Sequence, residues 1–211
     1  MAGNYKFTKN WFSKRDLEQH LKVDTQKEIH ILEIGSFEGR STVWFINNIL
    51  KNENSSITCI DAWMNFYQNT NSANTYDIDT KTKSGVDFVR DNIKGTFLHN
   101  ISETTQQHKV NLIHGYSQTE LPTLISQSKK YDIIFIDGNH TTPFVLSDAV
   151  LSWHLLSEGG IMIFDDYGWS NFGEGSITTT PKLAVDSFVN CFKDYIEVVW
   201  VDYRYAIEKI K

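Results

Sequence analysis

The stretch that decides the fold is Leu32-Glu33-Ile34-Gly35-Ser36-Phe37-Glu38-Gly39-Arg40-Ser41-Thr42. The apolar run at 29–34 predicts a buried strand, and the segment at 40–51 has the period of an amphipathic helix. Glycines at positions 35 and 39 lack a Cβ, so the turn between strand and helix can pass close to a ligand. The N–H groups at the start of the helix could hold a carboxylate. The stretch therefore predicts a strand, a ligand-binding turn and a helix.

The same alternation continues along the chain in both directions. Further strands are expected at 56–60, 110–114, 133–137 and 160–164, and helices at 11–21, 86–93, 119–128, 143–156 and 181–192. Residues 196–210 are expected to form two strands around Asp202. Alternating strands and helices favour βαβ units. We expect an α/β fold with a Rossmann-like, seven-stranded, mostly parallel sheet, helices on both faces and an antiparallel C-terminal hairpin strand.

The domain organisation is expected to be simple. Residues 1–211 form one domain, in which 1–25 are a helical extension, and the polar stretches 63–84 and 168–180 are loops or lids over a site. The helix at 143–156 is expected to be capped by Thr141 or Thr142 and to end at Leu156, with Gly159-Gly160 as its stop signal.

Composition and charge exclude several classes of protein. The formal net charge of −6 makes nucleic acid an unfavourable partner, because an acidic surface repels phosphates. Cys59 and Cys191 each lie in an apolar run and are predicted to be buried free thiols. No apolar leader and no membrane-length run is seen, so the sequence predicts a soluble, cytoplasmic protein without a membrane partner.

Two acidic residues stand at the ends of the first two strands. Glu33 could accept hydrogen bonds from an ammonium group or an amino-acid tail. Asp61 directly follows the second strand, where an acid can accept both hydroxyls of a ribose. A helix cap or a solvated loop acid is the alternative role of Asp61, and we favour the ribose role.

More acids and a histidine follow the fourth and fifth strands. Asp137, Asp165 and Asp166 would meet at the same sheet edge, where three carboxylates could hold Mg²⁺. Capping of helices or binding of water is the alternative for one or two of them. His140 titrates in the range of a general base. Its alternative is a helix-start histidine that only bonds the backbone.

Four segments together carry a resemblance to a known family: 32–42, 58–61, 136–140 and 159–169. From about Ile29 onward, the chain resembles class I S-adenosylmethionine-dependent methyltransferases of the methyltransferase 24 group. That group is related to macrocin-type sugar O-methyltransferases and to catechol-type metal-dependent O-methyltransferases. The resemblance implies S-adenosylmethionine as cofactor, with Mg²⁺ as a second, optional one.

The resemblance also implies roles for individual residues. The implied cofactor contacts are Glu33, Gly35, Ser36, Gly39, Ser41, Asp61, Ala62, Gly115, Ser117 and Asp137. Gly115 to Ser117 would contact the adenine edge, and the metal ligands would be Asp137, Asp165 and Asp166. Asp137 and His140 are the implied catalytic residues. Two positions depart from the catechol-type pattern, which commonly has asparagine at 166 and a catalytic lysine at 140.

The expected reaction is methyl transfer to a hydroxyl of a small-molecule acceptor such as a sugar, assisted by a divalent metal. Aromatic residues of the two polar stretches could stack on the acceptor: Trp63, Phe66, Tyr67, Tyr76, Trp169 and Phe172. The alternatives are an NAD-dependent Rossmann oxidoreductase and a catalytically silent S-adenosylmethionine-binding module. The missing third glycine and Glu33 count against the oxidoreductase. Nitrogen, protein or RNA acceptors and a homodimer are left open.

Overall fold

The computed structural model describes residues 3–63, 83–169 and 177–211, with only the backbone of 83–92. The strands are β1 His30–Ile34, β2 Ser56–Asp61, β3 Val110–His114, β4 Tyr131–Ile136, β5 Leu156–Phe164, β6 Ile196–Val201 and β7 Tyr205–Lys209. The α-helices are α1 Arg15–His20, α2 Arg40–Asn48, α3 Lys83–Glu103, α4 Ser117–Ser126, α5 Thr142–Trp153 and α6 Lys182–Phe192. Short 3₁₀ turns lie at η2 Gln107–Lys109 and η3 Ile177–Thr179.

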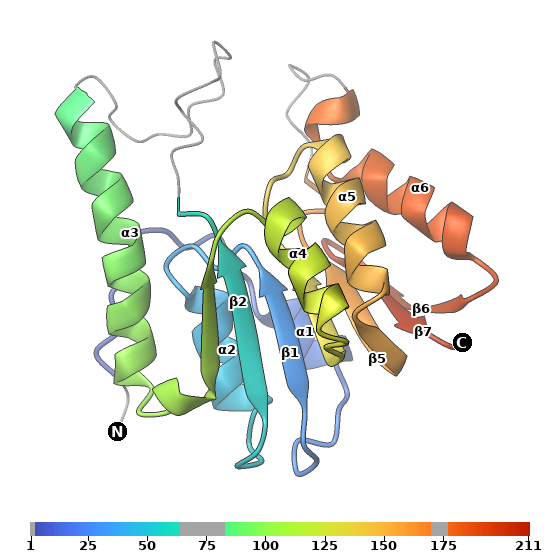
Figure 1. Ribbon diagram of the computed structural model, residues 1–211, viewed down its shortest axis with the longest axis horizontal. Coiled ribbons are helices and arrows are strands. Elements are labelled where there is room, and N and C mark those ends of the chain that lie inside the picture. The colour runs from blue at the N-terminus through green and yellow to red at the C-terminus, as the bar shows by residue number, and fades with distance from the viewer. Residues whose placement is uncertain (1–2, 64–82, 170–176) are drawn as a thin grey trace.

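Within the described residues the strands form one sheet in the order β3-β2-β1-β4-β5-β7-β6 (Figure 1). Strands β1 to β5 pair in parallel, whereas β7 is antiparallel to both β5 and β6. The expected seven-stranded Rossmann-like sheet with a closing hairpin is confirmed. The strand order reverses between β1 and β4, and this switch point is where open α/β sheets bind ligands.

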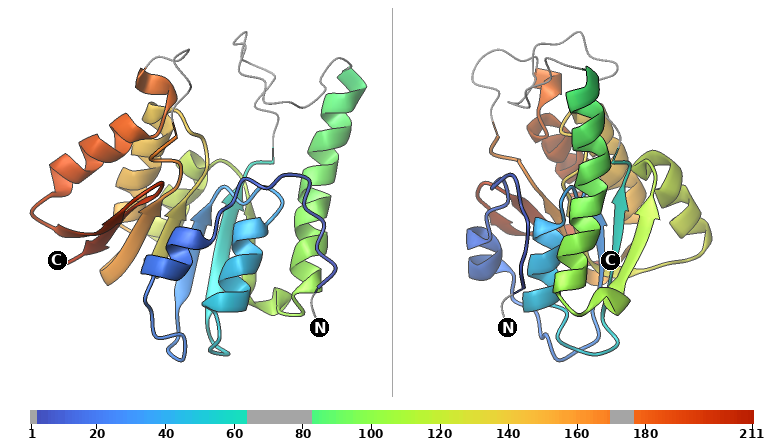
Figure 2. Two further views of the ribbon diagram at one scale, coloured as in Figure 1. Left: turned by 180° about the vertical axis from the view of Figure 1, so that it is seen from behind. Right: turned by 90° about the vertical axis from the view of Figure 1, so that its left-hand side faces the viewer.

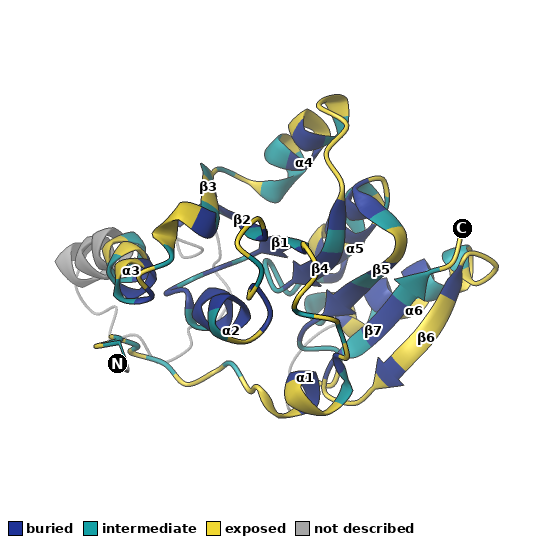
Figure 3. Ribbon diagram, turned by 90° about the horizontal axis from the view of Figure 1, so that it is seen from below, coloured by how far each residue is buried: buried dark blue, intermediate teal, exposed yellow. Residues whose placement is uncertain are grey.

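Helices cover both faces of the sheet, as Figures 2 and 3 show. One core packs α1, α2 and α3 against one face, with Ile31, Ile57 and Phe135 at its centre. The other packs α4, α5 and α6 against the opposite face around Leu32 and Ile134. Because side chains alternate along a strand, the odd-numbered positions of β1 all point to the α2 face. Glu33 belongs to this set.

The N-terminal helix is shorter than expected and begins at Arg15 rather than at position 11. The preceding residues are held by aromatic contacts instead: Trp11 stacks on Phe37 at 5.3 Å between ring centroids, and Phe12 packs against Trp44 and Phe135. These tertiary contacts override the local helical pattern. No helix in the described part of the chain is long and apolar enough to cross a bilayer.

The expected end of the fifth helix at Leu156, with Gly159-Gly160 as its stop signal, is wrong. Helix α5 ends at Trp153, and β5 already begins at Leu156, so both glycines lie inside the strand. Gly159 has a φ of +72° where the register between β4 and β5 shifts, which is the role of glycine in a bulge. Thr141 precedes the helix, but its side chain makes no capping hydrogen bond.

The prediction of two buried thiols is correct for Cys59 only. Cys59 is buried in β2, whereas Cys191 is exposed near the end of α6. The helix α6 packs through Ala184, Val185 and Phe188, whereas Cys191, in its last turn, is exposed. The apolar neighbours of Cys191 in the sequence therefore misled the expectation.

Candidate active site

The glycine turn after β1 lies at the switch point of the sheet. The N–H of Gly35 donates to the carbonyl of Ile60 at 2.9 Å, and the N–H of Asp137 donates to the carbonyl of Ile34 at 2.8 Å. Gly35 has a φ of +85°, and a Cβ there would lie 2.0 Å from the carbonyl oxygen of Asp137. Gly39 precedes α2 with a φ of +81°. Glycine is therefore required at position 35 by both conformation and space.

Glu33 supports this turn from inside the protein. Its side chain is fully buried, and its Oε2 accepts hydrogen bonds from the hydroxyls of Ser36 at 2.6 Å and Thr42 at 2.5 Å. Burial raises the pKa of Glu33, although these hydroxyls and that of Ser41 oppose the shift. Glu33 thus ties the strand end to the start of α2, and Ser36 and Ser41 lie around the same carboxylate.

Asp61 holds the turn from the neighbouring strand. Its Oδ2 accepts hydrogen bonds from the backbone N–H groups of Ser36 and Phe37, both at 2.8 Å, and its Oδ1 accepts one from Trp63 at 2.7 Å. Burial raises the pKa of Asp61, and the three backbone donors partly offset the shift. The sequence did not predict this clamp. The expected ribose contact would have to use the remaining lone pairs.

The end of β3 lies beside the end of β2. The N–H of Gly115 donates to the carbonyl of Asp61 at 3.1 Å, and a ring nitrogen of His114 is 2.9 Å from the carbonyl of Ala62. Ser117 is the first residue of α4. The residues expected to contact the cofactor are thus brought to three adjacent strand ends, those of β1, β2 and β3, except for Asp137, which follows β4.

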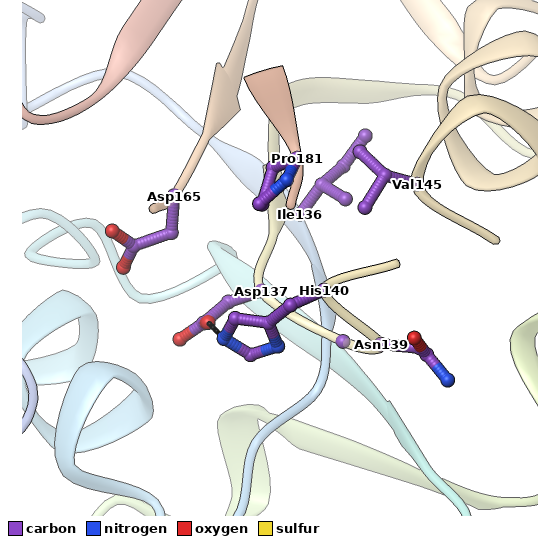
Figure 4. A pocket seen from close by; sticks show the side chains of 8 residues that line it. Ile136, Asp137, Asn139, His140, Val145, Asp165 and Pro181 are labelled. Atoms are coloured by element: carbon purple, nitrogen blue, oxygen red, sulfur yellow. Dashed lines mark ion pairs between the residues drawn. The ribbon is translucent and has the colours of Figure 1, made fainter. Parts of the chain in front are cut away.

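A cluster of two acids and a histidine lies on the other side of the switch point. The Nε2 atom of His140 is 2.5 Å from Asp166 Oδ2 and 3.9 Å from Asp137 Oδ1. Ligand atoms of the three side chains all lie within 4.8 Å of one another. Figure 4 shows His140 turned toward Asp137 in a small pocket. The lining residues are Ile136, Asp137, Gly138, Asn139, His140, Val145, Asp165 and Pro181.

Burial and neighbouring charges shift the pKa values of all three side chains in this cluster. Burial and the neighbouring carboxylates of Asp165 and Asp166 raise the pKa of Asp137 well above its usual range. Burial alone would lower the pKa of His140, but the hydrogen bond and charge of Asp166 outweigh it and the pKa is raised. Burial alone would raise the pKa of Asp166, but the hydrogen bond to His140 and the charge of His140 outweigh it, so the pKa is lowered. Asp166 also accepts a 2.5 Å hydrogen bond from the hydroxyl of Tyr203.

Asp165, the remaining expected metal ligand, forms an ion pair with an arginine outside the cluster. Its Oδ2 is 2.9 Å from a guanidinium nitrogen of Arg204, which is 1% exposed. Arg204 also pairs with Asp16 of α1 and donates to the carbonyl of Ser13 at 2.7 Å. The structure therefore groups His140 with Asp137 and Asp166, and pairs Asp165 with an arginine that the sequence analysis did not single out. In the sequence, Arg204 could have been noticed only as a charged residue in the turn between two apolar strands.

Only two of the aromatic residues that were expected to stack on the acceptor lie within the described residues. Trp63 is 7% exposed, packs on Phe97 and donates its indole N–H to the carbonyl of Phe37, so it anchors the glycine turn. Trp169 lies edge-on to His140 at 5.5 Å between ring centroids. The remaining expected stacking residues, Phe66, Tyr67, Tyr76 and Phe172, lie outside the described residues.

Solved structures share this fold. The O-methyltransferase TomG of Streptomyces achromogenes, in complex with SAM, has a TM-score of 0.62 at 16% identity, covering 89% of this chain and 75% of that one. The MycE methyltransferase of the mycinamycin pathway, in complex with Mg and SAH, has a TM-score of 0.56 at 18% identity, covering 92% and 48%. Because both identities are low, these similarities establish the fold alone.

Sequence comparison establishes the family. An uncharacterized protein of Acanthamoeba polyphaga mimivirus, R132, is 27% identical over 180 residues, which cover 85% of this chain and 70% of R132. The family model described as "Methyltransferase domain" matches residues 32–167, from the glycine turn through the Asp165-Asp166 pair. This match covers more than half of the chain and confirms the resemblance drawn from the sequence. The chain belongs to the methyltransferase domain family, as a methyltransferase rather than a nicotinamide-dependent oxidoreductase.

Proposed function

We propose that this methyltransferase transfers a methyl group from S-adenosylmethionine to a hydroxyl oxygen of a small acceptor such as a sugar. The observation that carries the proposal is the His140–Asp166 pair, held at 2.5 Å beside the glycine turn. TomG and MycE, which share the fold, are described in complex with SAM and SAH, respectively. O-Methylation needs a group that takes the proton of the acceptor hydroxyl, and an imidazole is suited to this.

In the proposed complex, the glycine turn and Asp61 hold the cofactor at the ends of β1 and β2. S-Adenosylmethionine supplies a methyl group already activated by a positively charged sulfur. The chain has to bring the acceptor oxygen into line with the carbon–sulfur bond. The carbon–oxygen bond would form as the carbon–sulfur bond breaks, and the hydroxyl proton would pass to Nδ1, the ring nitrogen of His140 that does not pair with Asp166. The carboxylate of Asp166 stabilises the resulting imidazolium.

The same cluster also fits a divalent cation. Two carboxylates and an imidazole form a mixed oxygen and nitrogen set, which suits manganese or zinc as well as magnesium. Asp137, His140 and Asp166 would hold the ion, which would lower the pKa of a bound hydroxyl. A metal would occupy His140 Nε2, so a metal and a free imidazole are alternative means of removing the proton. Turnover that survives EDTA favours the imidazole, and turnover lost in EDTA and restored by one metal favours the ion.

The cofactor assignment is tested by calorimetric titration with S-adenosylhomocysteine. We expect micromolar binding, about −8 kcal/mol, and at least a tenfold loss in Asp61→Ala, which removes the acceptor that clamps the glycine turn. Asp132→Ala is the matched control, because Asp132 also accepts a backbone hydrogen bond, from His30, at the opposite edge of the sheet. Absence of binding in the wild-type protein would overturn the cofactor assignment.

The base assignment is tested by His140→Gln. Loss of a positioned general base is expected to lower kcat by about 10²- to 10⁴-fold, while affinity for S-adenosylhomocysteine stays within a few-fold. Formation of S-adenosylhomocysteine is measured with the acceptor, from a panel of sugars and phenols, that gives the highest wild-type rate. His154→Gln is the control, since His154 is exposed beyond the end of α5. An unchanged kcat in His140→Gln would exclude the imidazole as the base.

A further inference from the structure

The turn between β6 and β7 brings one more side chain to the His140–Asp166 pair. Tyr203 lies in this turn, and its hydroxyl donates a hydrogen bond to Asp166 Oδ1 at 2.5 Å. The other oxygen of the same carboxylate, Oδ2, lies 2.5 Å from Nε2 of His140. Each oxygen of Asp166 is therefore engaged by a different side chain, one from the turn after β6 and one from the loop after β4.

The backbone sets the position of Tyr203. The antiparallel register of β5 and β7 pairs Phe164 with Tyr205, and two further steps along both chains place Tyr203 opposite Asp166. The N–H of Gly168 donates to the carbonyl of Tyr203 at 2.9 Å. A Cβ on Gly168 would lie 3.2 Å from a ring carbon of Tyr203 and 3.3 Å from its Cα, so the two segments pack closely. The ring is thus held without the help of its hydroxyl.

The hydroxyl of Tyr203 supplies what a single partner of Asp166 cannot. The last torsion of an aspartate side chain is broad, so a carboxylate held by one hydrogen bond can still turn. A second donor on the other oxygen removes this freedom. Burial and the hydrogen bond to Asp166 raise the pKa of Tyr203, so its hydroxyl keeps the proton that it donates. Tyr203 and His140 together therefore fix the plane of the carboxylate.

We propose that Tyr203 is a positioning residue, which acts through Asp166 to hold the imidazole of His140 in the orientation and tautomer needed for proton removal. The inference rests on the proposed function, because it gives the tyrosine a part in the proton transfer to His140. A carboxylate only accepts hydrogen bonds, so Nε2 carries its hydrogen toward Asp166. The lone pair of Nδ1 then faces the acceptor hydroxyl. Tyr203 affects the transfer by orientation and not by binding either reactant.

The experiment measures kcat, the KM for the acceptor and the dissociation constant of S-adenosylhomocysteine in Tyr203→Phe. This variant keeps the ring and removes only the hydrogen bond to Asp166. We expect kcat to fall about tenfold, within the ~10²-fold that a misplacement of 1 Å can cost, while KM and the dissociation constant stay within about twofold. Tyr195→Phe is the matched control, because Tyr195 directly precedes β6, has a similarly exposed ring and should leave kcat unchanged. An unchanged kcat in Tyr203→Phe would overturn the inference.

A double variant shows whether Tyr203 acts through Asp166. Asp166→Asn leaves one acceptor oxygen, which cannot serve both His140 and Tyr203 in the wild-type arrangement. Adding Tyr203→Phe to Asp166→Asn should then lower kcat by no more than about twofold further, because the residue through which it acts is already changed. Losses that multiply in the double variant would mean that Tyr203 acts by another route, which would also overturn the inference.

Crystal structures of the wild-type and Tyr203→Phe proteins test the inference without turnover. We expect the carboxylate of Asp166 to turn in the variant, so that its distance to Nε2 of His140 exceeds about 3.5 Å, beyond hydrogen-bond range. A pair that keeps its wild-type distance would contradict the inference and leave the proposed function intact. If the wild-type protein methylates no acceptor of the panel, the proposed function itself has failed.

Discussion

Gly35→Ala is expected to lower the free energy of unfolding by more than about 3 kcal/mol, at the severe end of single substitutions, and to abolish binding of S-adenosylhomocysteine. The new Cβ would lie 2.0 Å from the carbonyl oxygen of Asp137 and 2.5 Å from its carbonyl carbon. Both atoms belong to the backbone of the adjacent strand end, so no side-chain rotation can relieve the overlap. The turn would have to move away from β4, and Asp61 would lose the N–H groups that it holds.

Gly159→Ala separates this overlap from backbone strain. Gly159 also has a positive φ, +72°, but a Cβ there meets no atom within 4 Å. The variant should therefore cost only the left-handed strain, about 1–2 kcal/mol. Urea denaturation of both variants gives the difference between their free energies of unfolding. Equal losses would show that conformation alone, and not the close approach of Asp137, makes glycine necessary at position 35.

Arg204→Met is expected to cost about 3–5 kcal/mol of stability, because it leaves two buried carboxylates without their cation. Arg204 is 1% exposed, and its guanidinium contacts Asp16 and Asp165, whose side chains are each 7% exposed. It also lies over the rings of Phe12 and Phe135, at 5.2 Å and 5.6 Å from their centroids. The same residue thus attaches the N-terminal segment to the end of β5.

The matched control is Lys182→Met. Lys182 pairs with Asp186 at 2.7 Å, but both side chains are about half exposed, so the loss should stay below about 1 kcal/mol. Adding Asp16→Asn to Arg204→Met removes one of the stranded charges and should recover part of the stability. Urea denaturation gives the free energy of unfolding of all three proteins. Similar losses in the two single variants would mean that the buried pairs contribute no more than a surface pair.

The sequence by itself determined the fold class and the site edge. Short apolar runs alternating with helical periods required a parallel sheet, and the acids at the ends of β1 and β2 and directly after β4 and β5 had to gather where parallel strands end. Gly35 and Gly39 could be recognised because a turn between a strand and a helix needs left-handed conformations that glycine adopts freely. These are local properties, each readable within one strand and its following turn.

Only the tertiary structure decided the interaction partner of each acid. Asp165 and Asp166 are neighbours in the sequence, yet one is paired with Arg204 and the other with His140. Arg204 reaches Asp16 across 188 positions of the chain, and Gln118 reaches Asp148 across 30. A single sequence shows the charge of a residue but not its distant partner. The partner fixes the pKa, the protonation and the orientation of each acid, and therefore its role.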